Sequence, residues 1–309
     1  MAALEIHPLD LCFRHWPESI ASYLVIGPEG PVLVETGPCS TLPRLQSELA
    51  RYGCSPTDMS DVLVTHIHLD HAGAAGWWAQ QGTRVHLHRF GAPHLIEPSK
   101  LLSSARRIYG NRMDELWGDI IPAPAERVHS LQDGDLVQAG GLSFLALDTP
   151  GHARHHMVYL LGDVAFTGDA AGIRLPGQSY IQVPTVPPEF DLGEWQESIA
   201  RIRARSPAKL YLTHFGPVNE VEAHLSTVAS LLSEYAERIR QEMLGGSTRE
   251  EIVRRLAEWE ASRQMADSTA DIGQLSQTGF GFLSTYVDGI MRYWSKRLSS
   301  PDPGNEGRS

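Results

Sequence analysis

Four side chains that could bind a metal ion follow one another closely near the end of the first quarter of the chain. They are His66, His68, Asp70 and His71. The apolar run Asp61–Thr65 directly precedes them and predicts a short buried strand. A turn at the end of a strand can direct such side chains to one point, and imidazoles with a carboxylate suit Zn²⁺, Fe²⁺ or Mn²⁺. The spacing therefore favours a metal site over a polar turn that happens to be rich in histidine.

Three more candidate ligands lie further along the chain, each just past a β-like run. His152 follows the run LSFLALD within Thr149-Pro150-Gly151-His152, Asp169 follows Val164–Phe166, and His214 follows KLYLT. A single histidine after a strand is usually a surface or capping residue. Because every one of these positions comes at a strand end, we expect all of them to line one edge of a sheet sandwich.

The elements that must position these side chains alternate between strands and helices. Strands are predicted at Leu4–Leu11, Ser22–Ile26, Val32–Glu35, Arg84–His88, Leu142–Leu147, Met157–Leu161 and Lys209–Thr213, and a helix over Thr41–Tyr52. This interleaving indicates an α/β layered fold. An amphipathic helical insert over Ser99–Trp117 is expected to form a wall or a lid of a pocket, with Tyr109, Arg112 and Trp117 as candidates to shape it.

The last third of the chain has a helical pattern. We expect helices over Glu220–Leu244, from a capping box at Ser247–Glu250 to about Arg263, and from Phe282 to Trp294. The pattern predicts three parts: residues 1–219 with the metal site, a helical extension over residues 220–298, and a disordered tail over residues 299–309. The aromatic stripe from Tyr286 to Trp294 favours a core position or a homodimer contact through these helices.

Taken together, the motifs resemble those of the metallo-β-lactamase superfamily of metallohydrolases. The matching features are H-x-H-x-D-H at residues 66–71, P-G-H at His152, G-D at Asp169 and T-H at His214, in the order that the family has. The resemblance implies a four-layered αββα sandwich with two divalent metal ions, zinc before iron or manganese. The first ion would be bound by His66, His68 and His152 and the second by Asp70, His71 and His214, with Asp169 bridging them.

The resemblance implies a hydrolase that uses a metal-bridging hydroxide as its nucleophile. A water shared by two divalent cations loses a proton far more readily than bulk water and can attack an acyl or phosphoryl centre. Asp70 is the candidate catalytic residue, because it can orient the hydroxide or carry a proton to the leaving group.

Details of the motifs narrow the branch of the superfamily. Asp169 argues against a true β-lactamase, because β-lactamases of this fold generally lack an aspartate at that position. His68 argues against a flavodiiron protein, which typically has glutamate there. The chain also has no room for the inserted domain of the RNA- and DNA-processing branches. Hydrolases of a small ester, thioester or lactone remain, such as glyoxalase II-like thioesterases and lactonases, although the basic glutathione-contacting motif of glyoxalase II finds no match. The alternatives are a phosphodiesterase, a mononuclear-iron persulfide dioxygenase and a non-catalytic metal-binding scaffold.

The net charge of the chain and its cysteines indicate what the protein binds and where it is located. A net charge of −11 disfavours binding of a long polyanion, so we expect a small-molecule substrate and no nucleic acid. We expect no secretory signal and no membrane span, and the three cysteines lack a metal-site or disulfide spacing. These features predict a cytoplasmic protein with reduced thiols.

Several other polar side chains have weaker claims to the site. His155 and His156 either orient the neighbouring ligand or begin a strand, and Glu35 is a candidate to support the ligand loop through hydrogen bonds. Tyr180 is either a substrate-binding hydroxyl within Gly177-Gln178-Ser179-Tyr180 or an aromatic core residue. His86 and His88 share one face of a predicted strand, and a structural role is favoured for both.

Overall fold

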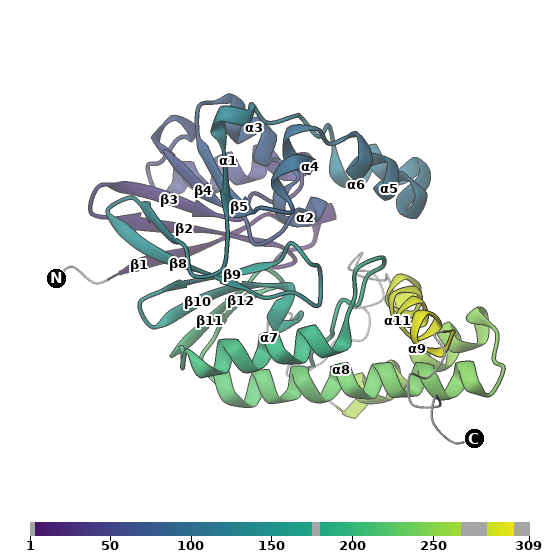
Figure 1. Cartoon of the computed structure of the whole chain (residues 1–309). Coiled ribbons are helices and arrows are strands. Elements are labelled where there is room, and N and C mark those ends of the chain that lie inside the picture. The colour runs from purple at the N-terminus through teal and green to yellow at the C-terminus, as the bar shows by residue number, and fades with distance from the viewer. Residues whose placement is uncertain (1–3, 175–179, 267–282, 300–309) are drawn as a thin grey trace, which may run out of the picture.

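The computed structural model describes residues 4–174, 180–266 and 283–299. Over these residues, two six-stranded sheets pack face to face, and helices cover the outer face of each sheet (Figure 1). This arrangement confirms the predicted four-layered αββα sandwich with a helical C-terminal region. Residues 177–179 and 300–309, for which a pocket loop and a tail were predicted, lie outside the described residues.

The first sheet runs in chain order from β1 to β6. Its strands are β1 Glu5–Asp10, β2 Ala21–Gly27, β3 Gly30–Val34, β4 Asp61–Leu63, β5 Arg84–His88 and β6 Val128–Leu131. The first three strands form antiparallel pairs, whereas β3 to β6 run parallel. The parallel strands direct the loops after β3 and β4 to the same edge of the sheet, where Glu35 and residues 66–71 follow them.

The second sheet has the order β12-β11-β10-β9-β8-β7. Its strands are β7 Leu136–Ala139, β8 Leu142–Asp148, β9 Met157–Leu161, β10 Val164–Gly168, β11 Lys209–Leu212 and β12 Gly216–Val218. All of its pairs are antiparallel except β10 with β11. Because β10 and β11 are parallel, Asp169 and His214 follow their strands at the same edge.

Helices flank both sheets, and two groups of them project beyond the sandwich (Figure 1). The helices on the side of the first sheet are α1 Leu42–Arg51, α2 Leu69–Ala72, α3 Ala75–Gln80, α4 Ala92–Ile96, α5 Ser99–Tyr109 and α6 Met113–Trp117. Those on the side of the second sheet are α7 Leu192–Ala204, α8 Val221–Leu244, α9 Arg249–Ala266 and α11 Leu283–Leu298. The projecting groups are α5 with α6, and α9 with α11.

Three apolar layers hold the sandwich together. One lies between the sheets, where Tyr23 and Val34 of the first sheet meet Phe144 and Phe166 of the second. The other two lie between each sheet and its helices. Since successive side chains of a strand point to opposite faces, neighbours in β10 serve different layers: Phe166 packs between the sheets, and Ala165 packs under the helices. Burial on both faces explains why these strands have nearly continuous apolar sequences.

The structure extends and corrects the elements expected from sequence. The predicted strands and helices are present with ends shifted by a few residues. The structure adds the strands β6, β7 and β12 and the helices α2, α3, α4 and α7. The capping box of α9 lies one residue later than predicted: Thr248 caps the helix, accepting from the backbone N–H of Glu251 at 3.3 Å, while the Glu251 carboxylate accepts from the backbone N–H of Thr248 at 2.8 Å. Ser247 instead donates to Glu242 at 2.6 Å.

The C-terminal helices share the apolar layer of the second sheet. Leu232 and Tyr235 of α8 and Val287 and Ile290 of α11 belong to the same buried cluster as Val158 of β9. The aromatic stripe of α11 therefore packs largely within the chain, and the boundary between residues 219 and 220 stays a prediction. Among the described residues, no helix combines the length and the apolar character that crossing a bilayer would require.

Candidate metal centre

All seven candidate ligands lie at one edge of the sandwich, although they come from four separate parts of the chain. His66 and His68 lie on the loop after β4, and α2 carries Asp70 and His71. The other three follow β8, β10 and β11. Their ligand atoms fall into two groups, and within each group all such atoms lie within 4.8 Å of one another. The groups are His66, His68, His152 and Asp169, and Asp70, His71 and His214.

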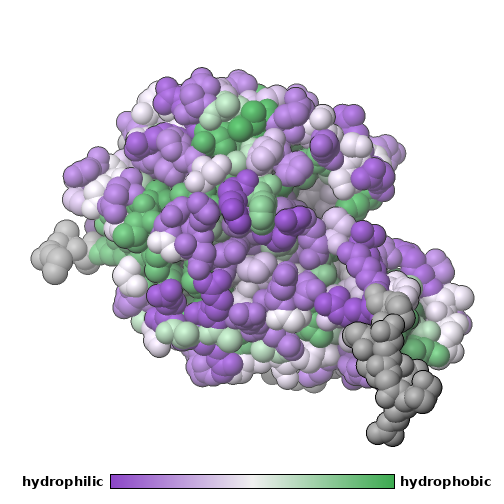
Figure 2. All heavy atoms as spheres, viewed as in Figure 1, coloured by the Kyte–Doolittle hydropathy of each residue, from purple (hydrophilic) through white to green (hydrophobic). Residues whose placement is uncertain are grey.

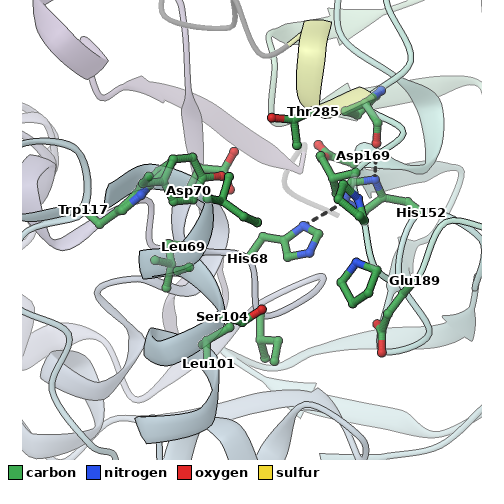
Figure 3. Close-up of a pocket in the computed structure, with 18 of the residues that line it drawn as sticks. His68, Leu69, Asp70, Leu101, Ser104, Trp117, His152, Asp169, Glu189 and Thr285 are labelled. Carbon is green, nitrogen blue, oxygen red and sulfur yellow. Dashed lines mark hydrogen bonds and ion pairs between the residues drawn. The ribbon is translucent and has the colours of Figure 1, made fainter. Parts of the chain in front are cut away.

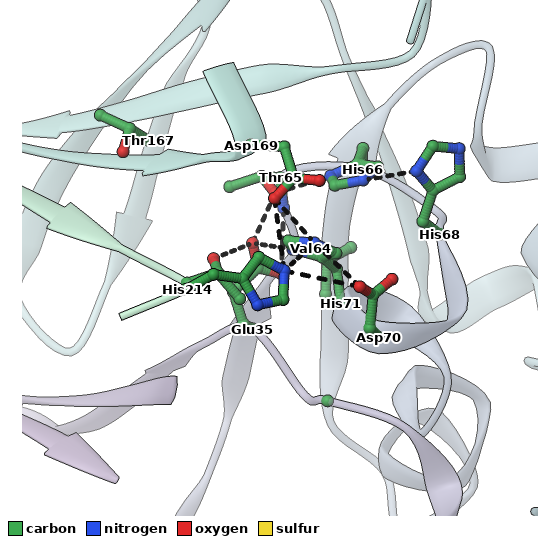
Figure 4. Close-up of polar contacts among 12 residues, drawn as sticks. Glu35, Val64, Thr65, His66, His68, Asp70, His71, Thr167, Asp169 and His214 are labelled. Atoms are coloured by element: carbon green, nitrogen blue, oxygen red, sulfur yellow. Dashed lines mark hydrogen bonds and ion pairs between the residues drawn. The ribbon is translucent and has the colours of Figure 1, made fainter. Parts of the chain in front are cut away.

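The carboxylate of Asp169 lies between the two groups. Its Oδ2 atom is 3.3 Å from Nε2 of His152, in the first group. Its Oδ1 atom is 3.3 Å from Nε2 of His71 and 3.4 Å from Nε2 of His214, in the second. Each oxygen therefore faces a different group, an arrangement that lets one carboxylate bridge two ions with both of its oxygens (Figure 4).

The remaining close contacts in the cluster join nitrogen atoms to each other. Nδ1 of His68 lies 2.9 Å from Nε2 of both His66 and His152, and Nε2 of His71 lies 3.3 Å from Nε2 of His214. Two nitrogens that bind one tetrahedral zinc ion lie about 3.3 Å apart. Oδ1 of Asp169 is buried and makes no hydrogen bond to a described residue. A buried, unsatisfied anionic oxygen among imidazole nitrogens is explained by a cation between them, so the residues present fit a metal centre.

Hydrogen bonds on the far side of the rings fix which nitrogen faces the centre. Nδ1 of His152 donates to the carbonyl of Pro184 at 2.8 Å, and Nδ1 of His214 donates to the carbonyl of Ser19 at 3.1 Å. A proton held on Nδ1 leaves the lone pair of Nε2 free for a metal. Nδ1 of His66 lies 3.1 Å from the hydroxyl of Thr65, which leaves its Nε2 facing the centre in the same way.

Glu35 contacts the second group from the side away from the cavity. Its Oε1 atom lies 3.1 Å from Nδ1 of His71, and it accepts hydrogen bonds from the hydroxyls of Thr65 and, at 3.4 Å, of Thr213 (Figure 4). Glu35 is buried and adopts a left-handed backbone conformation with φ 64°, which is uncommon for a residue other than glycine. The predicted hydrogen-bonding role of Glu35 is thus confirmed, and the side chain joins three segments of the site.

The electrostatics of the cluster favour cation binding. Burial and neighbouring imidazoles lower the pKa of His66, and burial lowers the pKa of His68 to about 3, so both rings are neutral ligands at pH 7. Burial opposes charge on His71 as well, but Asp169, Asp70 and Glu35 together raise its pKa well above the usual range. Nearby imidazoles outweigh burial and lower the pKa of Asp70 to about 2. Ionised carboxylates therefore surround the second group and attract positive charge.

The histidines beside the ligands have separate structural tasks. Nε2 of His156 accepts from the backbone N–H of Asp169 at 3.2 Å, and its Nδ1 lies 2.8 Å from the Thr149 hydroxyl. His156 therefore orients Asp169 and not the neighbouring His152. His155 lies 3.4 Å from Glu189 and lines the cavity described below.

His86 and His88 lie outside the centre, and the structural role favoured for both agrees with their contacts. Nε2 of His86 pairs with Asp61 at 2.7 Å, and Nε2 of His88 lies 3.4 Å from Asp148. The sequence did not predict these pairs, because both carboxylates come from other strands: Asp61 lies on the neighbouring strand β4, and Asp148 ends β8.

A cavity of about 270 Å³ opens above the centre. Figure 2 shows the surface hollowed below the projecting segment that carries α5 and α6. At its base lie five of the candidate ligands, namely His68, Asp70, His152, Asp169 and His214. The helical insert supplies one wall, as predicted, and Figure 3 shows Trp117, Leu101 and Ser104 on that side. The opposite wall is formed by residues 184–189 and by Thr285 and Tyr286 of α11.

The wall residues differ in part from those expected. Trp117 and Tyr109 line the cavity, whereas Arg112 is exposed and is not among the lining residues. Tyr180 packs in the apolar layer with Ile173, so its substrate contact stays a prediction. Phe13 and Tyr286 also line the cavity and were not expected there. The sequence pattern around Tyr286 does not predict a place in the cavity, because Tyr286 belongs to an apolar helical stripe that is typical of a core position.

Known proteins with similar sequences or structures point to one family. The model of the metallo-beta-lactamase superfamily matches residues 15–214. A metallo-beta-lactamase fold-containing protein of Sulfurisphaera tokodaii is 28% identical over 232 residues, which cover 73% of this chain and 84% of that protein. A crystal structure of a metallo-beta-lactamase family protein from Thermus thermophilus superimposes with a TM-score of 0.70 at 20% identity and covers 98% of this chain and 97% of that one.

The likeness to the Thermus thermophilus protein shows the fold alone, and it includes the C-terminal helices because it extends over nearly the whole chain. The family model covers β2 to β11 and ends at the last candidate ligand, His214. With two groups of histidine and aspartate ligands gathered at the sheet edge, this match leads to one conclusion: the chain belongs to the metallo-beta-lactamase superfamily.

Proposed function

We propose that this protein is a dinuclear metal-dependent hydrolase of a small ester, thioester or lactone. The observation that carries the proposal is the position of Asp169, whose two carboxylate oxygens face two different groups of ligand atoms. His66, His68 and His152 would bind the first metal ion, and Asp70, His71 and His214 the second. Zinc suits this set of nitrogen and oxygen ligands, and iron or manganese are the alternatives.

Two divalent ions in these positions would lower the pKa of a water that they share and polarise an acyl oxygen of the substrate. The chain itself has to supply the proton path. Asp70 is partly exposed and lines the cavity, and its Oδ2 atom lies 3.5 Å from Nε2 of His214. Its carboxylate is therefore placed to accept a proton from the attacking water and to deliver it to the departing alkoxide or thiolate.

The cavity suits a small substrate with an apolar part. Leu101, Ala105 and Trp117 form an apolar wall beside the candidate ligands, and the cavity volume of about 270 Å³ is at the lower end for small-molecule sites. Apolar side chains beside the centre lower the local polarity and strengthen its electrostatic interactions. We also propose a cytoplasmic location, which the three free cysteines support. A homodimer that forms through the C-terminal helices is a second proposal.

Elemental analysis of the protein purified without added metal, combined with a panel of esters, thioesters, lactones and phosphodiesters, tests this function. We expect about two zinc ions per chain and hydrolysis of at least one substrate class, with both reduced in Asp169→Asn. About one iron per chain would instead favour a dioxygenase that acts on persulfides, which oxygen uptake would reveal. Bound metal without hydrolysis of any substrate in the panel, phosphodiesters included, would favour a metal-binding scaffold.

A further inference from the structure

The C-terminal helix α11 is held firmly against the edge of the metal centre. The hydroxyl of Thr185 donates to the carbonyl of Tyr286 at 3.0 Å. Gly289 packs so closely on Thr185 that a Cβ atom there would lie 1.9 Å from the Thr185 carbonyl oxygen. Further along the helix, Nε1 of Trp294 donates to the carbonyl of Ala236 in α8 at 2.8 Å. These contacts fix the position of the residues that α11 turns toward the cavity.

Tyr286 is the phenol that α11 brings to the cavity. Its side chain is 3% exposed and lines the same cavity as Asp70 and Asp169. Burial, followed by the carboxylates of Asp169 and Asp70, raises the pKa of Tyr286, so the phenol stays protonated. A protonated phenol that lines a cavity can donate a hydrogen bond to a ligand bound there.

The wall opposite Tyr286 is aromatic and apolar. The rings of Phe13 and Trp117 stack with their centroids 5.5 Å apart, and Tyr109 meets Trp117 edge-on at 5.0 Å. Leu101 and Ala105 continue this wall along α5. The cavity, about 270 Å³ in volume, extends along this wall and suits an extended apolar chain.

We propose that the substrate is an ester or thioester with an unbranched, apolar acyl group, and that Tyr286 donates a hydrogen bond to its acyl oxygen. The acyl chain lies between the aromatic wall and α11, and the acyl carbon lies over the candidate ligands. As the attack proceeds, negative charge gathers on the acyl oxygen, so the hydrogen bond from the phenol strengthens in the transition state. This inference rests on the proposed hydrolase function.

The test uses the full chain loaded with zinc and a series of N-acetylcysteamine thioesters from acetyl to decanoyl. For the wild type, kcat/KM should rise about fourfold for each added methylene that contacts the apolar wall, because each buried methylene adds its transfer free energy. In Tyr286→Phe, kcat should fall about 100-fold with KM little changed, as when a single oxyanion donor is removed. Zinc content and melting temperature should match the wild type.

Two further variants separate this role from packing. Tyr293→Phe removes a hydroxyl two turns along the same helix, where the ring packs against Phe190 with the centroids 5.4 Å apart, and should leave kcat within about twofold. Ile108→Asn changes a cavity residue that is 42% exposed, so the fold should tolerate it, and it should flatten the dependence on chain length. Binding of hexylphosphonate, measured by calorimetry, should weaken in Tyr286→Phe.

The outcomes also distinguish the inference from the proposed function. An active wild type whose kcat does not change in Tyr286→Phe, or whose rate does not depend on acyl length, would overturn the inference and leave the hydrolase standing. A zinc-loaded wild type that hydrolyses no ester, thioester or lactone would overturn the proposed function, and the inference with it.

Discussion

Glu35 lies behind His71 on the side away from the cavity, with its Oε1 atom 3.1 Å from Nδ1 of the imidazole. The pair joins the end of β3 to α2, and both side chains are buried. A carboxylate in this position fixes the ring orientation and makes Nε2 a stronger donor to a metal. Glu35 thus acts on the second metal group without itself lying among the ligands.

Replacing Glu35 by Gln should therefore weaken one metal site selectively. The affinity for the second ion should fall about 10- to 100-fold, because the charge that supports His71 is removed while the size of the side chain is kept. Zinc titration followed by a chromophoric chelator measures the two affinities. The matched control is Glu48→Gln, since Glu48 is equally buried but pairs with Arg44 and Arg51 on α1. Equal affinities in both variants would contradict the role assigned to Glu35.

Asp70→Ala should remove the proposed proton carrier and one ligand of the second group. We expect kcat to fall by about 10²- to 10⁴-fold, which is the usual effect of a general acid–base group, together with a lower zinc content. Asp114→Ala, on the exposed face of α6, is the control and should change neither quantity. Near wild-type turnover in Asp70→Ala would show that the proposed mechanism is wrong.

Gly151 explains why a glycine precedes His152. Its φ angle is 122°, and a Cβ atom at this position would lie 2.2 Å from the backbone nitrogen of Trp195. Gly151→Ala should displace the loop that carries His152, which would lower the amount of zinc bound per chain as well as the stability. Gly162→Ala is the control: its φ angle is 59° and nothing lies within 4 Å of the added carbon. The control should cost about 1–2 kcal/mol and keep its zinc. Full zinc occupancy in Gly151→Ala would contradict this account.

Glu260 should make the stability of the fold depend on pH. This carboxyl of α9 is buried, which raises its pKa to about 7, although Arg263 at 3.1 Å opposes the shift. The folded state then holds a proton that the unfolded chain releases near its usual pKa of 4.5. The stabilisation from Glu260 is complete below about pH 4.5 and is lost as the pH rises through about 7.

Denaturant unfolding of the wild type and of Glu260→Gln at pH 5 and pH 8 measures this effect. The variant should gain stability relative to the wild type between these pH values, because glutamine carries no charge to be buried. The same difference between the two proteins at both pH values would show that Glu260 is not protonated in the folded state.

The kinds of ligand, and the strand ends from which they come, can be predicted from the sequence. Residues 66–71 are only a few positions apart, and the runs before His152, Asp169 and His214 are apolar enough to predict strands. These are local properties, since hydrophobic periodicity and the turn after a strand depend on neighbouring residues. For the same reason the sequence did not predict β6, whose His129 and Ser130 are exposed and give only a weak strand pattern.

The way in which these side chains meet depends on contacts between distant parts of the chain. Glu35 contacts His71 across 36 positions, each oxygen of Asp169 faces one ligand group, and Tyr286 reaches a cavity whose other wall begins near residue 100. Such pairings depend on the face-to-face packing of the two sheets and on the docking of α11 against Thr185. Non-local contacts set these distances, and a one-residue change of strand register would turn the side chains to the opposite face.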